Sequence, residues 1–122
     1  MIAYITIGSN DLDRSAAFFD TLFGALNGER AYSLDKMVAY RFANNSPMIL
    51  VTRPFDDNAA MHGNGTMIAL SAKDRPQVNC VHALALELGG TDEGAPGSRG
   101  KNFYGGYFRD PDGNKFNICV TS

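Results

Sequence analysis

The chain has 122 residues, of which 44% are hydrophobic and 20% charged, and its formal net charge is −2. This length and composition predict one globular domain that can bury a core without a disulfide framework. The eleven basic residues are scattered, which argues against nucleic-acid binding, and no apolar run approaches the roughly 20 residues needed to cross a bilayer. No secretory signal is visible, so we expect a cytoplasmic protein.

The first half of the chain predicts a strand, a helix and three further strands. Residues 2–7 are rich in β-branched and aromatic side chains, as in a strand. Ser9 or Asp11 can cap the following helix, in which apolar residues recur at three- and four-residue steps from Leu12 to Leu26. Turn residues at 35–36 and 44–47 separate the three shorter strands, which we expect at 30–34, 37–42 and 48–52.

The second half repeats this order with an offset of 63 residues, because Tyr4 and Asp11 correspond to Met67 and Asp74. The pattern predicts a strand at 67–72, a helix from Asp74 to the Gly89-Gly90 pair, and strands at 103–109 and 115–121. Asp110-Pro-Asp-Gly113 joins the last two as a tight turn. The glycine-rich segment 91–100 reads as a loop, and the remaining strand would fall near 91–93.

Internal repetition indicates two modules that pack together in a single domain. The first module covers about residues 1–54, a polar linker about 55–65, and the second module about 66–122. A cleft between two such halves is a natural place for a small-molecule site. We expect the two cysteines, Cys80 and Cys119, to be small buried side chains.

The order and spacing of several segments resemble the vicinal oxygen chelate superfamily, which includes glyoxalases, bleomycin-resistance proteins and extradiol dioxygenases. The resemblance covers nearly the whole chain. It is carried by Ile5-Thr-Ile-Gly8, Asp11-Leu-Asp-Arg-Ser15 with Phe18-Phe19, Ile68-Ala-Leu-Ser71, Leu88 to Gly94 with Pro96-Gly97, and Phe108-Arg-Asp-Pro-Asp-Gly-Asn-Lys115. It implies an α+β fold in which two tandem βαβββ modules form one curved, mixed β-sheet around a cleft.

The same resemblance implies a divalent metal in that cleft, held by His, Gln or Glu on inward-facing strand positions. Here the corresponding positions hold Tyr4, Met67 and Asn117, and the fourth falls on the strand 48–52, which offers at best the hydroxyl of Thr52. A phenol, a thioether and a carboxamide are poor substitutes for imidazoles and carboxylates around a divalent ion. We therefore expect no tightly bound metal and no cofactor.

Without a metal, the cleft would be a pocket for a small, partly aromatic or amphiphilic molecule. An alternative is that Tyr4 and Met67 fill the cleft and close it. The residues expected to line the pocket, from the ligand positions, their same-face neighbours and the adjoining glycine-rich loop, are Tyr4, Thr6, Met67, Phe103, Asn117 and Cys119.

Other candidate residues are better explained by structural roles. His82 lies within the second helix and His62 in the polar linker, and neither is expected to bind metal. The turn accounts for Asp110 and Asp112 without catalysis. Arg99 could bind an anion, but an ordinary surface arginine is the favoured interpretation.

These observations favour a metal-independent small-molecule binding protein that resembles glyoxalases and bleomycin-resistance proteins and that we expect to be a homodimer. Whether the chain is an enzyme stays open. The alternatives are a metal-dependent lyase, isomerase or dioxygenase of the same superfamily with atypical ligands, and an interaction module that assembles through its sheet edges.

Overall fold

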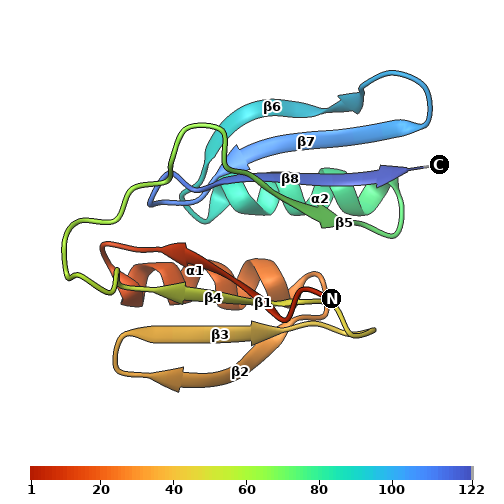
Figure 1. Ribbon diagram of the computed structural model, residues 1–122. Coiled ribbons are helices and arrows are strands. Elements are labelled where there is room, and N and C mark those ends of the chain that lie inside the picture. Colours follow the sequence, from red (N-terminus) through yellow and green to blue (C-terminus); the bar gives the residue numbers. More distant parts are fainter. Residues whose placement is uncertain (122) are drawn as a thin grey trace.

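The computed structural model describes residues 1–121 and contains two successive βαβββ modules (Figure 1). The first is built from β1 (Tyr4–Gly8), α1 (Leu12–Gly24), β2 (Glu29–Leu34), β3 (Met37–Arg41) and β4 (Met48–Thr52). The second is built from β5 (Ile68–Ser71), α2 (Arg75–Glu87), β6 (Thr91–Ser98), β7 (Phe103–Arg109) and β8 (Lys115–Thr121). The predicted α+β class and the two tandem modules are confirmed.

Each module forms its own four-stranded mixed sheet, so the strands make two hydrogen-bonded sheets and not one continuous sheet. The strand orders are β1-β4-β3-β2 and β5-β8-β7-β6. In each, the first and last strands of the module are parallel and the other pairs are antiparallel. Strands β1 and β5 are therefore the edges at which the two sheets face each other, and Figure 1 shows them on opposite sides of the gap between the modules.

The two helices begin in the same way, which confirms the repeat. Asp11 caps α1 by accepting a hydrogen bond from the amide of Arg14 at 3.1 Å, and Asp74 caps α2 by accepting one from the amide of Gln77 at 2.9 Å. Both helices lie behind the sheets in Figure 1, leaving the opposite sheet faces open. Neither helix has the length and apolar character to span a bilayer, within residues 1–121.

A single aromatic core joins the modules. Phe19 of α1 is fully buried, and its ring centroid lies 4.7 Å from that of Phe23 and 5.6 Å from that of Phe116 in β8. Phe116 in turn stacks on Phe108 of β7 with a centroid distance of 5.5 Å. Since these rings come from α1 of the first module and from the sheet of the second, the two modules share one hydrophobic core.

Two sequence-based predictions are wrong. The segment 91–98, expected to be largely loop, is strand β6, which pairs antiparallel with β7. Its register shifts on both sides of Gly94, and such bulges place glycine in a strand although its propensity for strands is low. Cys80 is exposed on α2 and not buried, whereas Cys119 is half-buried.

Candidate functional site

Two of the predicted site residues, Tyr4 and Thr6, lie on the open face of the first sheet. Side chains alternate along β1, and Ile7 on the other face belongs to the buried core. Tyr4 is 55% exposed. Thr6 lines a cavity of about 720 Å³ between this face and the linker, together with Met37, Phe55 and Met61 among others. An aromatic ring, a hydroxyl and flexible apolar groups are therefore accessible here.

Three more predicted residues share the open face of the second sheet. In the antiparallel pair of β7 and β8, Cys119 lies opposite Gly105, and Asn117 lies opposite Tyr107. Phe103 is two residues from Gly105, so its side chain lies on this same face. Asn117, Cys119 and Phe103 thus share one face of this sheet, with Phe103 nearer to Cys119 than to Asn117 along the strands.

The described strands do not bring the two halves of the predicted site into contact. No Cα atom of β1 lies within 8 Å of a Cα atom of β5 or β8. Met67 immediately precedes β5 and is partly exposed. The open faces therefore present two separate groups of candidate residues within one chain.

Asn117 is almost completely buried although its sheet face is open. Its side chain is 2% exposed, and its Nδ2 donates a hydrogen bond to the carbonyl oxygen of Gly106 at 3.0 Å. Gly105 lies against it, because a Cβ atom on Gly105 would be 3.0 Å from Nδ2 of Asn117 and 3.1 Å from the carbonyl oxygen of Ile118. The absence of a side chain at Gly105 thus leaves room for the Asn117 amide.

Replacing Gly105 by alanine is expected to lower the free energy of unfolding by about 1–3 kcal/mol, because the added methyl group meets a backbone carbonyl that cannot move aside. Gly24→Ala is the matched control, since a Cβ atom there meets nothing within 4 Å and alanine favours helix. Urea unfolding monitored by circular dichroism measures both. Equal effects of the two substitutions would contradict the close packing at Gly105.

Two cationic side chains flank an aromatic ring beside Asn117. The guanidinium carbon of Arg99 and the ammonium nitrogen of Lys115 each lie 5.7 Å from the centre of the Tyr107 ring, within the range of cation–π attraction. Arg99 also donates to the carbonyl oxygen of Ala95 at 2.7 Å. Tyr107 and Lys115 are not among the residues expected from the sequence to line a site. Side chains alternate between the two faces of a strand, so the positions of Tyr107 in β7 and Lys115 in β8 indicate that both lie on the same face as Asn117.

The residues at the family's ligand positions do not fit a divalent metal. A phenol at Tyr4, a thioether at Met67 and a neutral carboxamide at Asn117 replace the imidazoles and carboxylates that bind such an ion. Burial raises the pKa of the Cys119 thiol above its ordinary value, so a thiolate is disfavoured there at neutral pH. Residues 1–121 contain no group of three or more His, Cys, Asp or Glu side chains placed to hold a metal ion.

The two histidines have the structural roles that the sequence indicates. His82 is buried in α2, with Nε2 3.0 Å from Oδ1 of Asp92 and 3.1 Å from the carbonyl oxygen of Tyr107. His62 is exposed in the linker, with Nδ1 2.7 Å from the carbonyl oxygen of Gly63. Neither lies on an open sheet face.

The two aspartates of the β7–β8 turn also have structural roles. Asp110 accepts hydrogen bonds from the amides of Asp112 and Asn114 and from Nδ2 of Asn114, at 2.8–3.0 Å. Asp112 accepts hydrogen bonds from Ser9 and Arg14 of the first module. Their carboxylates are thus occupied by hydrogen bonds that shape the turn and attach it to β1 and α1.

Two repeated βαβββ modules, with helices on one side and open sheet faces on the other, define the paired-module fold of the vicinal oxygen chelate proteins. The chain belongs to the Glyoxalase/Bleomycin resistance protein/Dioxygenase superfamily, whose family model matches residues 1–118. The resemblance seen in the sequence is therefore confirmed.

Solved structures agree with this assignment. A glyoxalase/bleomycin resistance protein from Albidiferax ferrireducens T118 is 34% identical, with a TM-score of 0.89 over 98% of this chain and 97% of its own. Lactoylglutathione lyase from Agrobacterium tumefaciens is 22% identical, with a TM-score of 0.73 over 98% and 92% of the two chains. The fosfomycin resistance protein FosX from Listeria monocytogenes is 21% identical, with a TM-score of 0.77 over 100% and 93%. The last two share the fold alone. No curated protein matches the sequence.

Proposed function

We propose that the protein binds a small aromatic or amphiphilic molecule without a metal ion, as a cytoplasmic homodimer. The observation that carries this proposal is the donor set at the family's ligand positions: a phenol at Tyr4, a thioether at Met67 and a neutral carboxamide at Asn117. The exposed side chains of Tyr4 and Met67 are suited to packing against a ligand, and none of the three groups is suited to coordinating a divalent ion.

The open faces support binding through apolar contact. Tyr4, Leu34 and Met67 are exposed on or beside the sheets, and Phe55 and Met61 project from the linker around the cavity next to Thr6. Exposed apolar groups gathered in this way are typical of ligand-binding or protein-interaction surfaces. A second copy that covers these groups would enclose a ligand between subunits.

Aromatic and amphiphilic compounds are expected to raise the melting temperature in the presence of EDTA, because a ligand that binds only the native state stabilises it by mass action. Tyr4→Ala should remove the shift by deleting an exposed ring that binds ligand. Leu86→Ala is the control, since Leu86 is exposed on α2, on the helix side of the sheets. Differential scanning fluorimetry measures the shift, and sedimentation velocity in the same buffer measures the dimer.

Two results would contradict this proposal. Either no compound raises the melting temperature, or the melting temperature rises only when zinc, nickel, manganese or iron is added. The similarity to the fold of lactoylglutathione lyase supports a second candidate function, that of a metal-dependent lyase, isomerase or dioxygenase with atypical metal ligands. Elemental analysis of the untagged protein separates the two. A stoichiometric divalent metal would favour the enzyme.

A further inference from the structure

The internal repeat creates two equivalent junctions between the modules. In each, the loop between a strand and a helix of one module faces the turn before the last strand of the other. The first junction joins residues 9–15 to the β7–β8 turn, and the second joins residues 71–77 to the β3–β4 turn. The 63-residue offset makes Lys73 the counterpart of Asn10 and Gln77 the counterpart of Arg14.

The first junction is closed by a buried carboxylate. Asp112 has a side chain that is 2% exposed. It accepts hydrogen bonds from the hydroxyls of Ser9 and Ser15 at 2.7 Å, from the amide of Asn10 at 2.9 Å and from the guanidinium of Arg14 at 2.8 Å. The socket for this carboxylate is therefore filled by the chain itself.

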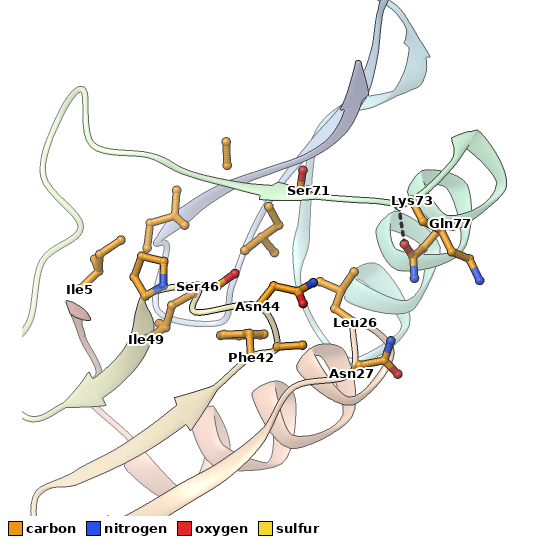
Figure 2. Close-up of a pocket in the computed structure, with 15 residues that line it drawn as sticks. Ile5, Leu26, Asn27, Phe42, Asn44, Ser46, Ile49, Ser71, Lys73 and Gln77 are labelled. Atoms are coloured by element: carbon orange, nitrogen blue, oxygen red, sulfur yellow. Dashed lines mark hydrogen bonds between the residues drawn. The ribbon is translucent and has the colours of Figure 1, made fainter. Parts of the chain in front are cut away.

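The second junction has no such carboxylate. The β3–β4 turn carries Asn44, Asn45 and Ser46 in place of an acidic residue. The amide of Lys73, whose counterpart Asn10 donates to Asp112, donates instead to Oε1 of Gln77 at 2.8 Å. The Lys73 amide is thus satisfied within its own module, and a cavity of about 480 Å³ lies between the turn and β5 (Figure 2).

The cavity combines an apolar interior with a polar end. Its apolar walls include Ile5, Phe42, Ile49 and Ile68. Figure 2 shows Ile5 at one end and Lys73 with Gln77 at the other. Its volume lies within the range of ordinary small-molecule sites. An elongated ligand would therefore place an apolar body between the modules and a polar head beside the start of α2.

The polar end offers hydrogen-bond donors and one positive charge. Lys73 is the one charged residue in the cavity lining, and it has no ion-pair partner within residues 1–121. The amide of Ala72 donates to Cys119 at 2.8 Å. Because backbone groups alternate in a parallel ladder, those of Ala69 and Ser71, which line the cavity, point away from β8. Those two residues present carbonyl acceptors as well as amide donors, so the group that favours a carboxylate is the ammonium of Lys73.

We propose that this cavity binds a small amphiphilic carboxylate, whose head group lies beside Lys73 at the start of α2 and whose apolar body lies between the modules. The site lies at the ends of β1 and β5 and the β3–β4 turn, away from the residues of the open faces. It does not depend on the proposed function, because it uses different residues and a different cavity.

The probes are 4-phenylbutyrate and its uncharged analogue 4-phenylbutanol, titrated into the protein by calorimetry and by heteronuclear NMR. The carboxylate is expected to bind at least tenfold more tightly than the alcohol and to shift the resonances of Ile5, Ile49, Ile68 and Ser71. Lys73→Met keeps most of the aliphatic stem, removes the charge and should weaken carboxylate binding about tenfold. Lys101→Met, an exposed lysine outside the cavity, should leave it unchanged.

A second variant tests the cavity itself. Ala43→Trp places a large side chain at an exposed position of the cavity wall, and it should abolish binding of both probes while the melting temperature stays near that of the wild type. Four results would overturn the proposal: no binding at millimolar probe, equal affinity for acid and alcohol, full affinity in Lys73→Met, or shifts confined to open-face residues such as Tyr4 and Tyr107. The last would assign the ligand to the open-face site.

Discussion

Replacing Asp112 by asparagine is expected to lower the free energy of unfolding by about 3 kcal/mol and the melting temperature by roughly 10 °C. Asp112 accepts bonds from two serine hydroxyls, a backbone amide and a guanidinium, all from the first module. An asparagine amide group would turn a donor toward these donors. A buried charge-assisted bond contributes about 1.5–3 kcal/mol, and such bonds are not additive.

The matched control is Asp57→Asn. Asp57 also forms a short ion pair, at 2.8 Å to Lys36, but its side chain is 67% exposed. Solvent-exposed pairs typically contribute about 0–1 kcal/mol, so this substitution should change the free energy of unfolding by less than about 0.5 kcal/mol. Chemical denaturation of both variants gives the comparison. Similar values for the two would show that the Asp112 contacts do not hold the modules together.

The substitution Asp112→Asn is also expected to change how the stability of the protein depends on pH. Burial raises the pKa of Asp112, but the Asn10 amide, the Ser9 and Ser15 hydroxyls and Arg14 together lower it below the ordinary value of 3.8. Between these two pKa values the unfolded chain binds more protons than the folded chain, so stability falls as pH drops through this window. In Asp112→Asn this contribution is absent, and the melting temperature should fall less steeply below about pH 4.

Most of the fold can be predicted from the sequence because the signals that define it are local. The caps at Asp11 and Asp74 are each followed by an apolar helical pattern, and alternating or apolar runs mark most of the strands. Strand β6 could not be predicted in full, because glycine and proline favour loops, and only its pairing with β7 makes the segment a strand.

The candidate site is less accessible to sequence analysis because it depends on distant partners. The turn motif identifies Asp112 as a turn residue, yet its partners Ser9 and Arg14 lie about a hundred residues away in the sequence. Tyr107 and Lys115 gain their place beside Asn117 only through the register of β7 and β8. The cavity at the second junction likewise depends on how two modules pack, which no single segment encodes.

Replacing Phe19 by alanine is expected to cost about 3–5 kcal/mol, the usual range for a fully buried phenylalanine. Total stabilities of native proteins are about 5–15 kcal/mol, so much of the fold's stability would be lost. Phe55→Ala is the control, because Phe55 is fully exposed on the linker and should change stability by less than about 0.5 kcal/mol. Urea denaturation measures both, and a small effect at Phe19 would contradict the shared core.

A double-mutant cycle tests whether Phe19 joins the two modules. Its ring centroid lies 5.6 Å from that of Phe116, which belongs to the other module. Leucine at either position keeps an apolar side chain but removes the ring contact, and the paired substitution should cost less than the sum of the single ones by about 0.5 kcal/mol or more. Additive effects of Phe19→Leu and Phe116→Leu would contradict an energetic coupling of the two modules through this ring pair.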